Sequence, residues 1–183
     1  MRRSLWLLLR LLLLVGLPAL PVAAQQLPPP PDTIAVPYRL RQADCALFPA
    51  AATLPPELAK LAPPPGRFTP TRRDVWTAEK ALRRVSLARV NAQPEPAYYA
   101  QYPALIQQHL ADYRRQYFGF VNPEGHRCLF LNLFIEQREE VPGSVPFWLR
   151  QAVWTYDGGS AYWSICYDLT THSFYDFRHN DEG

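Results

Sequence analysis

Proline is distributed unevenly along this chain of 183 residues, and its distribution limits where regular structure can form. Twelve of the 20 prolines lie between Pro28 and Pro70, including the runs at 28–31 and 63–65. Because proline lacks a backbone N–H and fixes φ, we expect neither a continuous helix nor an interior strand in this stretch. The sequence therefore predicts a semi-rigid polyproline-type spacer or an irregular strap over residues 25–66.

Two pieces of this proline-rich segment have patterns of their own. Pro55–Leu61 favours one short helical turn, because proline is tolerated at the start of a helix. Asp44–Phe48 is apolar enough to dock on the domain that follows.

The first 24 residues have the pattern of a secretion signal. Arg2 and Arg3 precede an apolar run over 5–15, and Val22–Ala24 has the small residues of a cleavage site. The apolar run is shorter than the roughly 20 residues that span a bilayer. We expect an exported protein, periplasmic or extracellular, that begins near Gln25, with an uncleaved membrane anchor as the alternative.

Charge argues against a nucleic-acid partner. The chain has 19 Lys+Arg and 16 Asp+Glu, and three of the arginines lie in the signal, which leaves 16 of each sign. A nucleic-acid binder needs a net basic surface to neutralise phosphates. Basic residues gather in 72–89 and acidic ones in 157–182. We expect these two segments to pack near each other or to be solvated, and a partner-binding patch is the alternative.

The domain predicted over residues 67–183 begins with two helices. Thr71 and Asp74 have the spacing of a capping box at the start of the first helix. Apolar residues then recur on one face at Val75, Ala78, Leu82 and Val85, with Trp76 beside them. A second helix is expected from Pro103, with its buried face marked by Ile106, Leu110 and Tyr113.

From Gln116 onward the apolar pattern has the period of a strand. Five strands are predicted, over 117–121, 127–135, 147–156, 160–169 and 172–178. Asn122–Gly125 has the residues of a type I turn, and Asp157–Gly159 those of a hairpin turn. The predicted fold is α+β, with two helices packed on one face of a roughly five-stranded antiparallel meander.

The side chains of this sheet can be assigned to two faces. In the second strand Leu129, Leu131, Leu133 and Ile135 share one face, and Cys128, Phe130, Asn132 and Phe134 share the other. In the predicted hairpin, one face holds Ala152, Trp154, Trp163, Ile165 and Tyr167, opposite Val153, Thr155, Tyr162, Ser164 and Cys166. We expect the face with Trp154 and Trp163 to lie under the helices.

No established catalytic motif is present in the sequence. Cys166 and His172 could form a thiolate–imidazole pair, but a half-buried cysteine and a surface histidine are favoured. Neither the histidines at 109, 126 and 179 nor the turn at Asp157 has a metal-binding pattern. We therefore assign no catalytic, cofactor-binding or metal-binding residue.

The three cysteines downstream of the signal allow at most one internal disulfide. In a simple meander Cys128 and Cys166 fall near opposite ends of strands separated by a third strand, too far apart for a bond. Cys45 on the strap could reach either of them, and this possibility stays open. Otherwise all three behave as small buried apolar residues.

Aromatic residues are the one surplus in composition. Tyr98, Tyr99 and Tyr102 precede the second helix, and Phe130 and Phe134 share a sheet face that Trp148 or Tyr162 could join. Covering of these rings by helices or by the strap is favoured. An exposed row could instead stack on sugar rings or anchor a partner protein.

Two segments, Tyr113–Phe120 (YRRQYFGF) and Asp157–Trp163 (DGGSAYW), resemble a small exported bacterial protein family with no assigned activity. The resemblance covers roughly Phe68 onward and implies no catalytic residue. The order of helices followed by a meander also resembles cystatin-like and NTF2-like folds, a likeness of architecture that implies no function.

These observations predict an exported non-enzymatic domain that binds a ligand or a protein in the cell envelope. A carbohydrate-contacting accessory module is the alternative, and a small hydrolase is a second one. No cofactor, nucleic-acid partner or membrane span is expected after the signal is removed.

Overall fold

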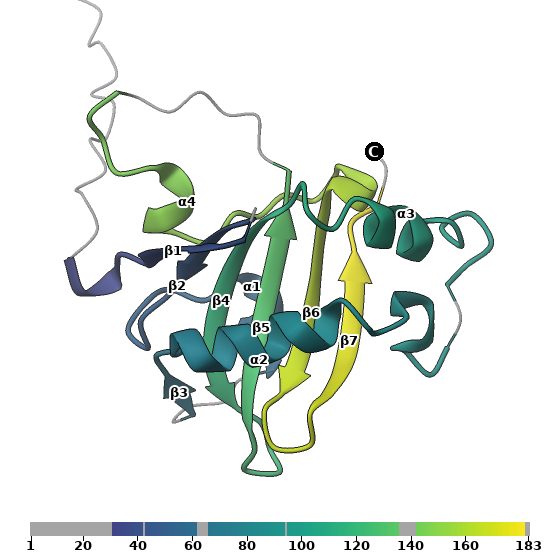
Figure 1. Cartoon of the computed structure of the whole chain (residues 1–183), viewed down its shortest axis with the longest axis horizontal. Helices are drawn as coiled ribbons and strands as arrows, with labels where there is room; N and C mark the ends of the chain where they lie inside the picture. Colours follow the sequence, from purple (N-terminus) through teal and green to yellow (C-terminus); the bar gives the residue numbers. More distant parts are fainter. Residues whose placement is uncertain (1–30, 42, 62–65, 94, 136–141, 182–183) are drawn as a thin grey trace, which may run out of the picture.

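The computed structural model describes residues 31–41, 43–61, 66–93, 95–135 and 142–181 (Figure 1). The predicted secretion signal and most of both proline runs lie outside the described residues. Within the described ranges, no helix has the length and apolar character needed to cross a bilayer.

The described residues form a seven-stranded sheet with helices on both of its faces. The strands are β1 (Val36–Leu40), β2 (Ala43–Leu47), β3 (Arg67–Phe68), β4 (Arg114–Val121), β5 (Arg127–Phe134), β6 (Tyr162–Asp168) and β7 (Ser173–His179). The α-helices are α1 (Pro56–Leu61), α2 (Arg72–Leu82), α3 (Tyr102–Gln108) and α4 (Phe147–Arg150). Short 3₁₀ turns are η1 (Pro31–Thr33), η2 (Leu87–Arg89) and η3 (Gly159–Ala161).

The sheet extends into the proline-rich segment. Its order is β1-β2-β4-β5-β6-β7, with β3 also paired to β4. All pairs are antiparallel except β2 with β4, which run parallel. The expectation of no interior strand is therefore wrong for β2, which has no proline and bonds to a strand on each side. Pro37 lies in the edge strand β1, where the missing donor is tolerated.

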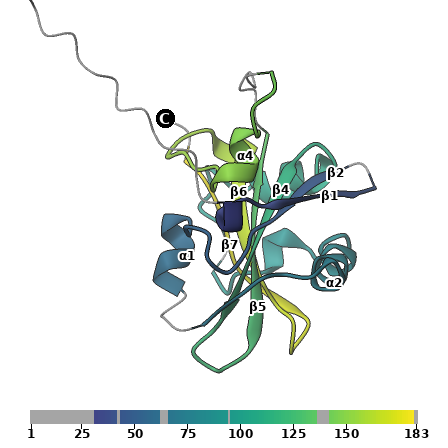
Figure 2. The same cartoon turned by 90° about the vertical axis from the view of Figure 1, so that its left-hand side faces the viewer.

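Each face of the sheet carries its own apolar core. In Figure 2 α2 lies on one side of the sheet and α1 on the other. The first core joins Val75, Ala78 and Leu82 of α2 and Ile106 of α3 to Leu129, Leu131 and Leu133 of β5. The second core joins Leu58 of α1 and Trp148 and Leu149 of α4 to Phe118, Phe130 and Phe134. The α+β class is confirmed, whereas helices on one face only and a five-stranded sheet are wrong.

Helix α2 begins where the capping signature predicts. Thr71 Oγ1 accepts from the Asp74 N–H at 3.2 Å, and Asp74 Oδ2 accepts from the Thr71 N–H at 2.9 Å. The predicted apolar stripe is buried, but Trp76 points outward and is 53% exposed.

The β4–β5 hairpin forms as predicted. Gly125 donates to the Asn122 carbonyl at 2.9 Å and has φ of 82°, which glycine adopts without strain. The alternation of side chains along β5 places the predicted residues on the two faces.

The predicted strand over 147–156 is wrong. Residues 147–150 form α4 after Pro146, and the chain then crosses the second face in an irregular path. The buried Gln116 amide holds this path from β4. Its Nε2 donates to the Trp148 and Gln151 carbonyls at 2.6 and 2.8 Å, and its Oε1 accepts from Val153 N–H and Asn132 Nδ2 at 2.8 and 2.9 Å.

Because no strand forms over 147–156, the strands that follow pair differently from the predicted meander. β5 pairs directly with β6, and Asp157–Gly159 is no hairpin turn but the entry to η3, with Gly158 at φ of 106°. Trp163, Ile165 and Tyr167 lie in the first core as predicted. Ala152 packs against the second core, and Trp154 lies in neither core and contacts Tyr156.

We predict that Gln116→Leu lowers the free energy of unfolding by about 3 kcal/mol, because it leaves several buried backbone groups without partners. Urea denaturation measures the change. Gln101→Leu, at an exposed position, is the matched control and should change stability by less than about 0.5 kcal/mol. Equal stability of the two variants would contradict the role given to Gln116.

Candidate functional site

The structure separates the two residues of the proposed thiolate–imidazole pair. Cys166 is fully buried in the second core. His172 is exposed in the β6–β7 turn, with Nδ1 3.2 Å from the hydroxyl of Tyr167, a residue of the first core. Because Cys166 is enclosed in the second core while His172 lies in the turn and contacts a residue of the first core, the two do not form a thiolate–imidazole pair.

The three cysteines are free and buried. Cys128 and Cys166 lie on adjacent antiparallel strands, so the predicted separation by a third strand is wrong. Cys45 lies in the first core, on the face opposite to the other two, so it cannot pair with them in this fold. Burial raises the pKa of Cys45 to about 11, partly opposed by Arg115, and burial likewise raises the pKa of Cys128 and of Cys166. These thiols therefore stay protonated and unreactive at neutral pH.

Each of three histidines pairs with one carboxylate. His109 contacts Asp112, His179 contacts Glu95, and His126 Nδ1 lies 2.7 Å from Asp168 Oδ2. Among the described residues, no group of three or more His, Cys, Asp or Glu side chains is placed to hold a metal ion.

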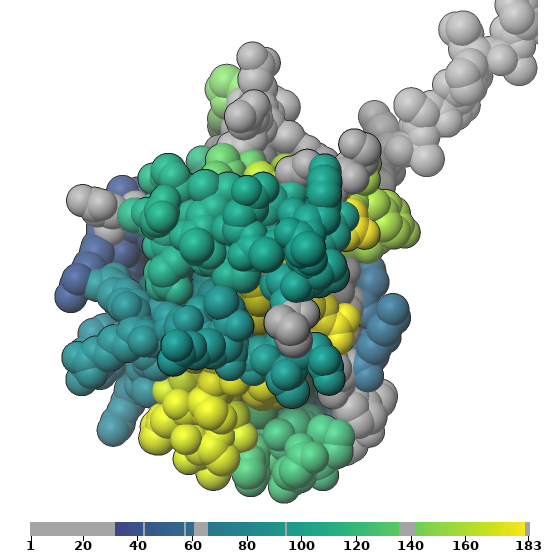
Figure 3. Space-filling view, turned by 90° about the vertical axis from the view of Figure 1, so that its right-hand side faces the viewer, coloured from purple at the N-terminus to yellow at the C-terminus, as the bar shows by residue number. Residues whose placement is uncertain are grey.

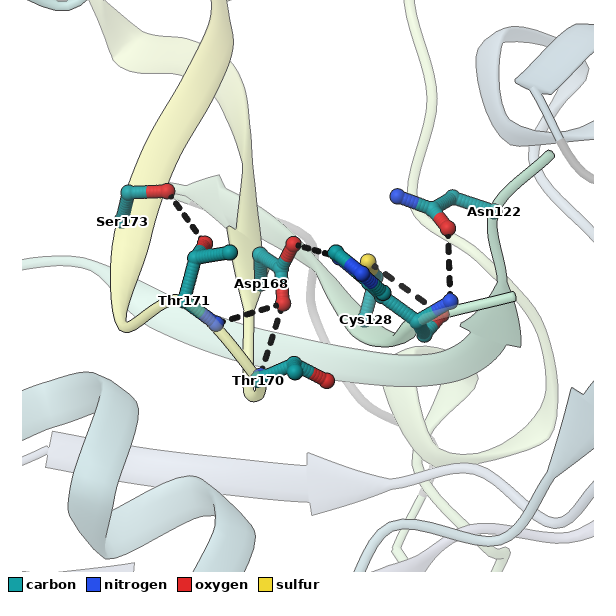
Figure 4. Close-up of polar contacts among 7 residues, drawn as sticks. Asn122, Cys128, Asp168, Thr170, Thr171 and Ser173 are labelled. Atoms are coloured by element: carbon teal, nitrogen blue, oxygen red, sulfur yellow. Dashed lines mark hydrogen bonds and ion pairs between the residues drawn. The ribbon is translucent and has the colours of Figure 1, made fainter. Parts of the chain in front are cut away.

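Asp168 ties two turns together at one end of the sheet. Figure 3 shows the β6–β7 turn, in yellow, beside the green β4–β5 turn below the helices. In Figure 4 Asp168 Oδ1 accepts from the backbone of Thr170 and Thr171, at 2.7 and 3.0 Å. Burial alone would raise the pKa of Asp168, but the hydrogen bonds from His126 and from these N–H groups outweigh it and lower the pKa. The His126–Asp168 pair lines neither the groove beside α2 nor the pocket beside α1, so we assign it a structural role.

Most of the aromatic residues considered for sugar binding are covered, but Tyr98 is 68% exposed and Tyr162 is only partly buried. Phe130 and Phe134 are buried in the second core, where they pack with Leu58 of α1 and Trp148 of α4. Tyr102 is also buried and packs with Tyr99 on the ring of His179.

The strongest candidate site is a basic groove beside α2. Two adjoining hollows of about 260 and 450 Å³ share Leu40, Arg41 and Arg83 in their walls. The first hollow is also lined by Trp76, Glu79, Lys80 and Arg84, and the second by Ala43, Gln108, Leu110, Ala111 and Arg115. The basic groove therefore brings together the β1–β2 turn, α2 with the two arginines that follow it, and the end of α3 with the residues after it.

A buried ion pair forms the floor of the basic groove. The side chains of Arg115 and Glu79 are only 4% and 3% exposed, and Arg115 Nε lies 2.8 Å from Glu79 Oε1. That N–H is not aimed at the oxygen, so the contact is an ion pair rather than a hydrogen bond. The two terminal nitrogens of Arg115 donate to the Tyr113 and Leu110 carbonyls at 2.9 and 2.7 Å.

Tyr117 lies beneath the floor, fully buried in the first core. Its hydroxyl donates to Glu79 Oε1 at 2.6 Å, and burial together with the Glu79 charge keeps the pKa of Tyr117 well above its usual value. Tyr117 therefore stays a protonated donor, and the floor is electrically neutral as a unit.

The rim of the groove carries uncompensated positive charge. Arg41, Arg83 and Arg84 are exposed and contact no carboxylate in the described part of the chain. Lys80 Nζ lies 5.2 Å from the centre of the Trp76 ring. Arg41 adopts φ of 55°, a left-handed conformation that a non-glycine residue holds only at a cost. The rim can bind anions through the paired donors of its guanidinium groups.

Sequence analysis found half of this site. The basic segment 72–89 contributes Lys80, Arg83 and Arg84 to the groove, and all three are exposed, which agrees with the expected solvated face. Arg41, Arg115 and the role of Glu79 were missed. Glu79 follows Val75 by four residues and precedes Leu82 by three, so it lies on the buried stripe of α2. A carboxylate at such a position implies a buried cationic partner.

No protein-family model, curated protein or solved structure matches this chain. The resemblance to a small exported bacterial family stays a prediction.

We predict that Asp168→Asn destabilises the protein in a pH-dependent way. The folded-state pKa of Asp168 is lowered, so its contribution is fully present above the unfolded-state pKa of about 3.9 and is lost as the pH falls through the folded-state value. The variant should lose about 2 kcal/mol at about pH 5, and the deficit should shrink towards about pH 2 in denaturant titrations. Asp112→Asn, in the exposed pair with His109, is the control with little effect. A deficit that does not vary with pH would disagree with this account.

A second prediction concerns the floor of the groove. Glu79→Gln leaves the buried Arg115 charge without a counter-ion and should cost about 3 kcal/mol of stability. Glu79→Gln combined with Arg115→Gln should be less destabilised than the sum of the two single changes, as a double-mutant cycle in urea measures. Lys80→Gln, on the exposed face of α2, is the control. Additive effects in the cycle would show that the two charges do not interact.

Proposed function

We propose that this chain is an exported, non-enzymatic domain of the cell envelope that binds a small ligand bearing two or more negative charges in the basic groove. The observation that carries the proposal is the placement of Arg41, Arg83 and Arg84, unpaired among the described residues, around one concavity. Guanidinium groups bind carboxylate and phosphate through paired hydrogen bonds, so several arginines at one concavity favour a multiply charged ligand.

The neutral floor strengthens the expected binding. Because Glu79 is already paired with Arg115 and bonded to Tyr117, its charge does not cancel that of the rim. A concave shape favours a small ligand over a flat protein surface. Leu40 and the exposed ring of Trp76 offer apolar contact to the uncharged part of such a ligand.

Binding without catalysis is supported by the chemistry of the lining. Glu79 is the one carboxylate among the described lining residues. It is already bonded to the Tyr117 hydroxyl and paired with Arg115, both residues of β4. The nearby Cys45 and Tyr117 are held protonated by burial, so they do not supply a nucleophile or a base at neutral pH.

Export is supported by the amino-terminal sequence and by the state of the cysteines. The first 24 residues have the three parts of a secretion signal. Buried free thiols are protected from the oxidants of an exported compartment.

Calorimetric titration of the purified protein tests the proposal. We expect pyrophosphate or citrate to bind with a dissociation constant below about 1 mM, whereas chloride at equal ionic strength does not compete. Arg41→Gln and Arg83→Gln should each weaken binding about tenfold, since a hydrogen bond to a charged group contributes about 1.5–3 kcal/mol.

The matched control is Arg73→Gln, an exposed arginine at the start of α2 that does not line the groove. It should leave the affinity unchanged. An equal loss in all three variants would mean diffuse attraction to a basic helix, and absence of binding by either probe would refute the proposal.

A further inference from the structure

A row of polar side chains crosses the apolar second face of the sheet. In the strand register Gln116 of β4 faces Asn132 of β5, Asn132 faces Ser164 of β6, and Ser164 faces Arg178 of β7. Four neighbouring strands thus place a polar residue at the same level, on a face that is otherwise built from Phe118, Phe130 and Phe134.

The two halves of this polar row have different roles. Gln116 and the Nδ2 group of Asn132 are used to hold the segment from Trp148 to Val153. Ser164 is only 7% exposed, and its hydroxyl has no hydrogen-bond partner in the described ranges. The hydroxyl oxygen is not enclosed by protein but open to the adjacent pocket, so it can donate to or accept from a ligand there.

Ser164 lines a pocket of about 240 Å³ on this face. Asn132 and Ser164 contribute from the sheet, and Lys60 contributes from α1. The other lining residues include Trp154, Tyr162 and Arg178, with Thr155 and Asn180 at the edge.

Local backbone features position the walls of the pocket. A β-bulge shifts the pairing of β6 and β7 between Ser164 and Cys166, and Asp176 there has φ of 54°. Arg178 Nε donates to the Asp176 carboxylate at 2.7 Å, which fixes the arginine at the pocket. The ring of Tyr162 packs over Gly158, where an added Cβ would meet it at 2.6 Å.

We propose that this pocket binds a single acidic sugar residue, a pyranose ring that bears a carboxylate. The Ser164 hydroxyl and the Asn132 oxygen suit sugar hydroxyls, and the Trp154 and Tyr162 rings suit an apolar ring face. Lys60 suits the carboxylate, together with the two terminal nitrogens of Arg178, whose Nε alone is bonded to Asp176. The pocket is smaller than the cavities of about 300–1,000 Å³ that hold drug-sized ligands, which favours one ring.

This site is independent of the proposed function. The basic groove lies on the face of the sheet covered by α2, and the pocket lies on the face covered by α1 and α4. A substitution can therefore abolish binding at one site and leave binding at the other unchanged.

NMR titration of the purified protein, following the Trp154 indole N–H signal, tests the proposal with methyl glucuronide as the probe. We expect a saturable shift with the glucuronide, and binding at least tenfold weaker for methyl glucoside, which lacks the carboxylate, and for acetate, which lacks the ring. Ser164→Ala and Arg178→Gln should each weaken glucuronide binding about tenfold, and Arg84→Gln, in the basic groove, should leave it unchanged.

Three outcomes would overturn the proposal: no shift with the glucuronide, acetate binding as tightly as the glucuronide, or full affinity in both Ser164→Ala and Arg178→Gln. Arg178 is exposed, so its variant keeps the test valid if Ser164→Ala fails to fold. Pyrophosphate binding to the same samples reports separately on the basic groove.

Discussion

The carboxylate of Glu79 is the point at which helix α2 is attached to the sheet. It is one of the few charged groups buried in the described part of the chain, and it lies between Arg115 and the hydroxyl of Tyr117. A buried charge is tolerated only with a partner and with hydrogen bonds, so the rotation of α2 about its axis is restricted. This restriction turns Arg83 and Arg84 towards the β1–β2 turn and so creates the basic groove.

The second face of the sheet is organised by a neutral amide instead of an ion pair. Gln116 is buried, and three of its four hydrogen bonds hold the backbone from Trp148 to Val153 against the strands, while the fourth joins it to Asn132 of β5. The amide thereby fixes the chain that leads into Trp154, one wall of the polar pocket. Each face thus uses a polar side chain of β4, at positions 115 and 116, to attach the segment that covers it. Adjacent residues of a strand point to opposite faces, which explains why these two neighbours serve different layers.

The parts of the fold with a local signature could be predicted from sequence. The capping box at Thr71 and the turn at Asn122–Gly125 involve residues within a few positions of one another, and both form as expected. The apolar segment 147–156 has a pattern that also fits a strand. Its actual path depends on Gln116, more than 30 positions earlier in the chain. The parallel pairing of β2 with β4 is equally non-local, so proline content alone gave a wrong expectation for that strand.

The candidate groove shows the same division between local and distant information. The cluster of basic residues in α2 is visible in the sequence, whereas the approach of Arg41 depends on how β1 and β2 join the sheet. Glu79 could have been identified from its place on the apolar stripe, but its partner Arg115 could not. Charged residues in a sequence therefore indicate a binding surface only when the fold shows which of them are already paired.

The most direct test of this account is an NMR titration that follows the arginine Nε–Hε signals while pyrophosphate is added. The account predicts that the signals of Arg41 and Arg83 shift together and saturate, while those of Arg72 and Arg73 at the start of α2 stay in place. Shifts of similar size and without saturation at all exposed arginines would contradict it, because they would show that the rim charges do not form one binding site.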